Sequence, residues 1–282
     1  MPEIQPDADR TETTNEKQEY RVAIFSRYGD VDRFTETLVS VLGLNRIDAR
    51  IHAAHVPGLL PERLTQKQAE SMAAAINELG MSAAVCSESE IPSLEHPTVV
   101  HHVACGADGL EVLGLRGAQI SLIRWPDLEL VSVGSVPLEA GHHSSTESMV
   151  VVRSAPHSFD ETSDHITSSG LECWLIAKHP QRIYCLTHNQ MNYDYLGPRK
   201  TGSASANFGE FLKDVAHFSE ETFLTPSTHQ FLNHDSVDGY TFANSEQLKQ
   251  ATLVQFLLHR VIEAGDRRVK RTHFGVEIGP TL

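Results

Sequence analysis

The hydrophobic positions of residues 20–87 follow helical spacing between short apolar runs. The run "YRVAIFS" at the start has the composition of a strand. After it, apolar residues recur at i, i+4, i+7 and i+8, which is the spacing of one helix face: Phe34, Leu38, Val41 and Leu42. The pattern predicts a strand followed by an amphipathic helix.

Two further helices are predicted in the same region. In "NRIDARIHAAHV", Ile47, Ile51 and Ala54 face one way, and the proline that follows ends the helix. The stretch "LTQKQAESMAAAINELG" has apolar residues at helical spacing and begins with a capping box formed by Thr65 and Gln68. Its final glycine provides the left-handed residue that stops the helix.

Residues 20–90 as a whole read β-α-α-β-α-β. "GLLPER" contributes a short strand before the third helix, and "MSAAVC" follows that helix as another strand. Because helices with one apolar face need a second layer to cover it, this order predicts an α+β module with its helices on one small sheet.

From residue 98 to residue 200 the pattern changes to short β-rich runs. "TVVHHVAC", "GLEVLGL", "AQISLIRW" and "LELVSVGSV" are separated by the turn sequences "GADG", "RG" and "PD". Strands resume at "LECWLIA", at "RIYCLTH" and, as a further candidate, at "MNYDYL". Residues 138–170 are rich in Ser, His and acidic residues and predict a mobile loop with a strand-like island at "MVVV". We expect an antiparallel β-rich domain that this loop interrupts.

Helical spacing returns in residues 201–282. "NFGEFLKDVAHF" places apolar residues on one stripe, and Asn207 is placed to cap that helix. "NSEQLKQATLVQFLLHRVIEAG" repeats the pattern, with Ser245 as its cap and Gly265 as its stop. We expect these helices to pack on the β-rich domain.

Composition and charge narrow the classes of function. The chain has 282 residues and a formal net charge of −14, so it should repel nucleic acid and anionic membrane surfaces. Residues 1–19 are polar and acidic, which is typical of a disordered tail and unlike a secretory signal. No apolar run reaches membrane-spanning length. We therefore expect a cytoplasmic protein with protein partners, without membrane insertion or general nucleic-acid binding.

The four cysteines, Cys86, Cys105, Cys173 and Cys185, are scattered and form no C-x-x-C pair. They lie within apolar runs or at the end of one, where cysteine usually behaves as a small buried hydrophobe. The spacing favours neither a zinc ribbon nor a thioredoxin-type motif, and it does not forbid a Cys173–Cys185 disulfide.

A set of positions stands out along residues 20–87: Val22 and Ile24, Gly43-Leu44, Asp48-Ala49-Arg50, Pro57, Ala69-Glu70 and Gly80. With this spacing the module resembles the C-terminal domain of the bacterial large-subunit ribosomal stalk protein. The adaptor ClpS, which presents proteolysis substrates, is similar in fold. The resemblance implies the β-α-α-β-α-β arrangement and a partner surface on the first two helices.

The stalk family docks translation factors through cations on its first helix and the partner of that helix. At the matching positions this chain has Glu36, Val39 and Arg50, of which only Arg50 keeps the charge. Because Glu36 reverses the electrostatic complementarity, the resemblance implies a protein-binding module without a ribosomal stalk role. In the ClpS reading, acids before the first helix hold a substrate amino group. Asp30 and Asp32 occupy that region, and favourable acids at a helix start explain them too.

The β-rich domain and the helix after it are similar to the pleckstrin-homology arrangement of seven strands and a closing helix. This similarity rests on element order alone, so it implies a fold and no functional residues. It adds a second candidate binding surface to that of the α+β module.

Candidate metal ligands occur in two places. Asp48, His52 and His55 lie within two turns of the second predicted helix and could ligate zinc, although an ordinary polar helix face has the same pattern. The predicted loop holds further histidines, including His142 and His143, which could bind metal adventitiously. No H-E-x-x-H motif, nucleophile elbow or cofactor-binding motif occurs, so the sequence names no catalytic residue and no cofactor.

The stretch "YLGPRKTGSASANFG" combines two cations with small residues before a helix: Arg199, Lys200, Gly202 and Ser203. Backbone N–H groups at a helix start together with cations suit an anion. The spacing matches neither the Walker nor the dinucleotide motif, and a flexible connection is the plainer interpretation. The sequence thus favours a non-enzymatic interaction or regulatory protein. The alternative is a phosphate- or nucleotide-binding enzyme with its site at residues 197–207.

Overall fold

The structure is a computed structural model that describes residues 19–114, 116–137, 169–234 and 236–265. The chain divides into two compact units, Met1–Ile91 and Pro92–Leu282, and each has a hydrophobic core of its own. The fold is mixed α+β with antiparallel strand pairs, as predicted. Among the described helices, none is long and apolar enough to cross a membrane.

Several predicted segments fall outside the described residues. They are the acidic tail except Glu19, the loop expected at 138–170 except its last two residues, and residues 266–282 of the C-terminal helical segment. The roles expected of these segments stay predictions, including metal binding by the loop histidines.

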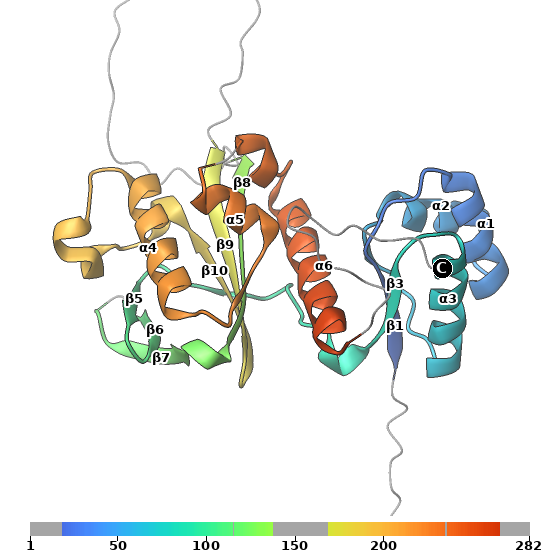
Figure 1. The fold of residues 1–282 in the computed structure, drawn as a ribbon, viewed down its shortest axis with the longest axis horizontal. Helices are drawn as coiled ribbons and strands as arrows, with labels where there is room; N and C mark the ends of the chain where they lie inside the picture. The colour runs from blue at the N-terminus through green and yellow to red at the C-terminus, as the bar shows by residue number, and fades with distance from the viewer. Residues whose placement is uncertain (1–18, 115, 138–168, 235, 266–282) are drawn as a thin grey trace, which may run out of the picture. The chain divides into compact units, whose positions relative to one another are not determined.

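The first unit follows the predicted order of elements (Figure 1). These are β1 (Tyr20–Ile24), α1 (Val31–Leu42), α2 (Arg46–Ala54), β2 (Gly58–Leu59), α3 (Gln66–Glu78) and β3 (Ala83–Ser87). The strands form an antiparallel sheet in the order β2-β1-β3. The three helices lie on one side of this sheet, and a 3₁₀ turn, Glu88–Glu90, follows β3.

The core of the first unit lies between this sheet and the helices. Phe34 and Leu38 of α1 and Met72 and Ile76 of α3 are buried in one cluster with Val22 of β1. Each such side chain stabilises the fold by about 1.5–3 kcal/mol when it is fully buried. The helical stripes visible in the sequence therefore specify how α1 and α3 sit on the sheet.

The second helix, α2, buries the face opposite to its isoleucines. Ile47, Ile51 and Ala54 do share one face, but that face points to solvent, with Ile47 74% and Ile51 50% exposed. Ala49 and Ala53 pack inward instead, 0% and 5% exposed. Because alanine side chains are small, α2 can approach the core closely without inserting its larger residues.

Local hydrogen bonds fix the helix ends in the first unit. The predicted capping box is present: Thr65 Oγ1 accepts from the Gln68 N–H, and Gln68 Oε1 accepts from the Thr65 N–H at 3.1 Å. Asn45 caps α2 by accepting from two backbone N–H groups. α1 ends at Gly43, whose φ of 70° is a left-handed conformation that favours glycine.

The second unit contains two sheets (Figure 1). The first is a three-stranded antiparallel sheet, in the order β5 (Val103–Gly106), β6 (Gly109–Leu113) and β7 (Gln119–Arg124). The second has the order β11-β8-β9-β10-β4, with β4 (Thr98–Val99), β8 (Leu128–Pro137), β9 (Ser169–Lys178), β10 (Gln181–Thr187) and β11 (Phe223–Leu224). The helices are α4 (Ala204–Phe218), α5 (Pro226–Leu232) and α6 (Ser245–Glu263).

Helices α4 and α6 cover opposite faces of the five-stranded sheet (Figure 1). On one face, Val131 of β8 belongs to a core with Phe208 and Phe211 of α4. On the other face, Thr252 of α6 donates to the Ser132 hydroxyl at 2.8 Å. The buried residues of the three-stranded sheet join the core on the α4 side. β8 is buried along almost its whole length because both faces are covered.

Some strands of the second unit differ from the expectation. The segment "MNYDYL" is not a strand and leads into the 3₁₀ turn Asp194–Arg199. The two-residue strands β4 and β11 pair in parallel with β10 and β8, so only the longer strands of this sheet are antiparallel. The sequence pattern also missed α5, whose Pro226 occupies the first turn and whose cap is Thr225.

Two predicted helix caps were wrong. Ser203 rather than Asn207 caps α4, because the Asn207 amide is buried and bonded to the Thr201 backbone. Asn244 rather than Ser245 caps α6, because the Ser245 hydroxyl donates to the buried Glu172 carboxylate. In α4 a hydrogen bond to the preceding loop, and in α6 a hydrogen bond to a distant strand, takes the side chain that the local pattern assigns to the cap.

Candidate functional site

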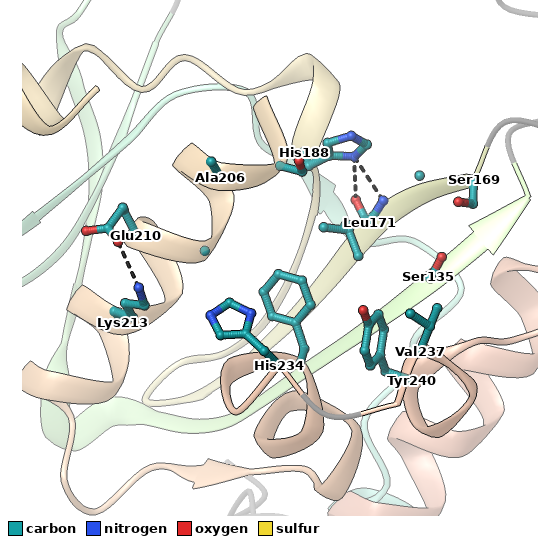
Figure 2. Close-up of a pocket in the computed structure, with 14 residues that line it drawn as sticks. Ser135, Ser169, Leu171, His188, Ala206, Glu210, Lys213, His234, Val237 and Tyr240 are labelled. Carbon is teal, nitrogen blue, oxygen red and sulfur yellow. Dashed lines mark hydrogen bonds and ion pairs between the residues drawn. The ribbon is translucent and has the colours of Figure 1, made fainter. Parts of the chain in front are cut away.

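A pocket of about 620 Å³ lies in the second unit between the first half of α4 and the end of α5 (Figure 2). Strand ends of β8 and β9 contribute Ser135 and Ser169 to its wall. α4 contributes Glu210 and Lys213, and the segment after α5 contributes His234. The lining is therefore polar on the strand side and charged along α4.

Aromatic rings form the remaining wall. Phe231 packs edge-on against Tyr240 at 5.5 Å between ring centroids and against Phe208 at 6.2 Å. The imidazole of His188 is edge-on to Phe208 at 6.4 Å. Such rings offer apolar surface against which a planar ligand could stack.

The two pocket histidines differ in their surroundings. His188 Nδ1 accepts a hydrogen bond from the Leu171 N–H at 2.9 Å, and burial lowers the pKa of His188. The lowered pKa favours the neutral form of the His188 imidazole at pH 7. His234 has a φ of 57° just after α5, and its ring points toward the pocket (Figure 2).

The serines of the pocket are not arranged for nucleophilic catalysis. Ser205 Oγ lies 3.0 Å from Ser203 Oγ, and Lys213 Nζ pairs with Glu210 at 2.9 Å. In the described part of the pocket, no serine is hydrogen-bonded to a histidine. The arrangement can hold a small molecule, but it contains no assembled nucleophile and base.

The predicted anion-binding cations are both bound to carboxylates. Arg199 donates to both oxygens of Asp214, each at 2.7 Å, and this contact raises the pKa of Arg199. Lys200 Nζ lies 2.7 Å from Asp194, and this contact lowers the pKa of Asp194. Tyr195 donates to the same Asp214 at 3.1 Å, which ties the segment to α4.

The small residues of the same segment serve its connection to α4. Gly202 is exposed, and Ser203 Oγ accepts from the Ala206 N–H at 3.3 Å. The four residues lie close together in the chain, but an anion would have to compete with Asp194 and Asp214 for the cations. The anion site stays a prediction, and the ion pairs do not favour it.

All four cysteines are free thiols. Burial raises the pKa of Cys86 to about 11 and the pKa of Cys105 and Cys185 to about 12. Because thiolates are the reactive form, these groups are weak nucleophiles near neutral pH. Cys173 lies opposite Leu186 across β9 and β10, and the disulfide that the sequence allowed is not formed.

The three candidate zinc ligands of α2 do not converge. His52 Nε2 lies 2.9 Å from Glu62, His55 Nδ1 lies 2.7 Å from the Ile51 carbonyl oxygen, and Asp48 accepts from the side chain that caps α2. Within the residues that the structure describes, no three His, Cys, Asp or Glu side chains are grouped to bind a metal.

The first unit presents a different candidate surface, which we call the α2 outer face and define as Ile47, Ile51 and Ala54. Two exposed ion pairs join α1 to α2: Asp32 with Arg50 at 3.7 Å, and Glu36 with Arg46 at 4.0 Å. Glu36 and Arg50, two of the three residues matched to the stalk surface, therefore belong to these pairs. The third, Val39, packs partly against the core.

The sequence did not predict the pocket. It predicted α2 and the stripe of its isoleucines, but not which of its apolar faces is buried. The pocket combines strand ends, one helix and the segment around α5, and only Ser205 and Ala206 come from the 197–207 stretch. No periodicity brings such segments together. The outward direction of the α2 isoleucines did have a signal, because Ala49 and Ala53 offer a second, smaller apolar face at i and i+4.

Comparison with protein-family models, with curated proteins and with solved structures finds no match to this chain. The resemblances to the stalk domain, to ClpS and to the pleckstrin-homology arrangement stay expectations from the sequence. A function for the chain has to be inferred from the α2 outer face and from the pocket.

Proposed function

We propose that the chain is a non-enzymatic interaction protein that binds a partner protein through the α2 outer face. The observation that carries this proposal is the exposure of Ile47 and Ile51, 74% and 50%, on one side of a well-packed helix. Large aliphatic side chains cost free energy in water, and covering one fully contributes about 1.5–3 kcal/mol. The resemblance to the stalk family also assigns partner binding to the first two helices.

The occupant we expect is an amphipathic helix of the partner. Ile47 and Ile51 are one turn apart, so they form a ridge that fits between the apolar residues of a second helix. The pairs Asp32–Arg50 and Glu36–Arg46 border this ridge with both signs of charge. A polar, charged rim around an apolar centre is the usual anatomy of a protein interface.

Photo-crosslinking of the full chain tests the proposal. A benzophenone side chain at Ala54, on the α2 outer face, should form an adduct with a specific partner in lysate. The same group at Ala74, an exposed position of α3, is the control and should not form that adduct.

Substitution separates contact from folding. Ile51→Glu should weaken binding of the purified partner at least about tenfold, since central apolar contacts dominate interface energies. Ala74→Glu adds the same charge to an exposed helix position of the same unit and should leave affinity unchanged. Equal affinity of the Ile51→Glu variant, or the same adducts from both crosslinker positions, would overturn the proposal.

A second candidate function is small-molecule binding in the pocket, favoured by its volume and its aromatic wall. Gly209 lines the pocket on α4, and a Cβ added there would meet no atom within 4 Å. Gly209→Leu should therefore fill the space while the helix is kept. Nucleotides and phosphorylated metabolites should raise the melting temperature of the wild-type chain but not of this variant. An unchanged wild-type melting temperature would contradict this candidate.

A further inference from the structure

Two aromatic rings form a corner in the pocket of the second unit. Phe231 and Tyr240 both line the pocket, and their ring planes stand 89° apart with 5.5 Å between the centroids. The buried Phe208 packs edge-on against Phe231 at 6.2 Å and holds it from the core side. A flat ligand that lies against one ring of the corner presents its edge to the other, and both contacts are favourable between aromatic rings. The corner therefore fits a planar ring.

A buried hydroxyl lies beside this corner. Ser135 of β8 is 6% exposed and lines the pocket, and its bridge with Thr241 brings it next to Tyr240 (Figure 2). Within the residues that the structure describes, the Ser135 hydroxyl has no hydrogen-bond partner. A buried polar group without a partner costs about 1–3 kcal/mol, so a ligand in the pocket gains by bonding it. Because a hydroxyl donates and accepts, it suits a ring N–H, a ring nitrogen or a carbonyl oxygen.

The charged side chains of the pocket lining neutralise each other. Apart from its two histidines, the described lining holds one anion and one cation, Glu210 and Lys213. They pair at 2.9 Å, and Arg199 lies 3.8 Å from the second oxygen of the same carboxylate. A phosphate would have to displace Glu210 from Lys213 and would be repelled by this carboxylate. The lining therefore favours a ligand part without net charge.

We propose that the pocket binds a neutral, planar heteroaromatic ring with hydrogen-bonding groups, of the kind found in a nucleobase. The inference rests on the second candidate function, small-molecule binding in this pocket, and narrows its ligand class. The ring lies against the Phe231–Tyr240 corner and bonds the Ser135 hydroxyl. The volume of about 620 Å³ is within the usual range of small-molecule sites, about 300–1,000 Å³. A nucleotide then binds through its base, and its phosphate adds no affinity.

Calorimetric titration of the full chain with matched ligands tests the class. The probes are the four common ribonucleosides and their 5′-monophosphates. For the base that binds best, nucleoside and monophosphate should have dissociation constants within about threefold of each other. The affinity should also stay constant when the salt concentration rises from about 0.05 M to about 0.5 M, because salt screens only contacts between charges.

Substitutions test where the ring binds. Ser135→Ala should weaken nucleoside binding about five- to tenfold, which is the effect of one lost hydrogen bond. Ser132→Ala is the matched control, since Ser132 is another buried serine of β8 but bonds Thr252 of α6 on the opposite face of the sheet. Tyr240→Leu removes a ring and should weaken binding at least about threefold, whereas Tyr240→Phe keeps the ring and most of the affinity. The melting temperature of each variant without ligand checks that it is folded.

The outcomes separate this inference from the function on which it rests. A monophosphate that binds at least about tenfold more tightly than its nucleoside would overturn the neutral-ring proposal. So would unchanged nucleoside affinity in both Ser135→Ala and Tyr240→Leu. A sugar phosphate that binds while no nucleoside does would also overturn it, but loss of that binding in Gly209→Leu would keep the pocket as a small-molecule site. Binding of no probe to the wild type would contradict both.

Discussion

Two long strand edges of the second unit are treated in opposite ways. The outer edge of β8 is closed by the chain itself: β11 pairs with Leu130 and Val131, and the Thr228 hydroxyl accepts from the Val133 N–H and donates to the Val131 carbonyl oxygen. Further along, the Phe242 N–H donates to the Ser135 carbonyl oxygen at 2.8 Å. The outer edge of β7 has no such cover in the part of the chain that the structure describes.

The difference between the two edges follows from how deeply each strand is buried. β8 is buried along almost its whole length, so an unpaired N–H or C=O on its edge would be costly. The residues around α5 prevent this in three ways. β11 pairs with β8, the Thr228 hydroxyl bonds its backbone, and the Phe242 N–H donates to it. β7 lies at the margin with Ile120 and Leu122 exposed, and its backbone groups reach water, so this edge can be left open.

The largest expected effect comes from a change that separates β6 from β7. A Cβ on Gly109 would lie 2.3 Å from the Ile123 carbonyl oxygen, which is backbone and cannot rotate away. Gly109→Ala should destabilise the second unit by about 3 kcal/mol, the upper end for overpacking. Urea denaturation measures this free energy of unfolding.

The matched control is in the same hairpin. A Cβ on Gly106 would meet only the Gly109 carbonyl oxygen, at 3.8 Å. Gly106→Ala should therefore change stability by less than about 1 kcal/mol. Equal unfolding free energies for the two variants would show that close packing does not hold β7 in place.

The next effect concerns the closed edge. Thr228→Val keeps the shape of the side chain but removes the hydroxyl that accepts from the Val133 N–H at 3.0 Å. Because the site is buried, the N–H is left without an acceptor, and we expect a loss of about 2 kcal/mol in urea denaturation. Thr241→Val also loses a hydroxyl, but at an exposed position, and should cost less than about 0.5 kcal/mol. A Thr228→Val variant as stable as the Thr241→Val control would mean that the β8 edge is closed by β11 alone.

The same contrast explains how much of the fold the sequence could predict. The strands and the stripes of α1 and α3 came from local periodicity, which needs no knowledge of distant residues. The Thr225–Thr228 closure joins segments that are far apart, and nothing in "TPSTHQ" reveals that β8 is the acceptor. Ser245 shows the same limit, because its hydroxyl donates to the distant Glu172 instead of capping α6.

The candidate sites also differ in whether local periodicity could predict them. Arg199 and Lys200 stand together in the sequence as two free cations, but the fold places Asp214 and Asp194 beside them. Both ion pairs depend on the folded path of the chain between the partners, six and 15 residues apart, and no periodicity of the sequence reveals that path.

The sequence did predict that Ile47 and Ile51 share one face of α2. It did not predict that the face with Ala49 and Ala53 is the buried one. The apolar faces of a helix can therefore be predicted from the sequence, whereas the ion-pair partners of a charged residue cannot.

The smallest expected effect is a pH dependence at the closed edge. Glu129 lies in β8 where the pairing register shifts, is 7% exposed and is bonded to Arg260 of α6. Burial raises the pKa of Glu129 above its ordinary value of 4.5 despite the arginine. The folded state therefore binds a proton more readily than the unfolded state. Between the raised pKa and the ordinary value, the wild type should gain stability as the pH falls.

Glu129→Gln removes this titration, so its unfolding free energy should lack the gain. The difference between wild type and variant should shift in favour of the wild type by less than about 1 kcal/mol as the pH falls toward 4.5. Glu220→Gln changes an exposed carboxylate and serves as the control. Parallel pH curves for wild type and Glu129→Gln would mean that Arg260 fully offsets the burial of the carboxylate. The β8 edge would then carry a satisfied charge, and its contrast with the open β7 edge would rest on hydrogen bonding alone.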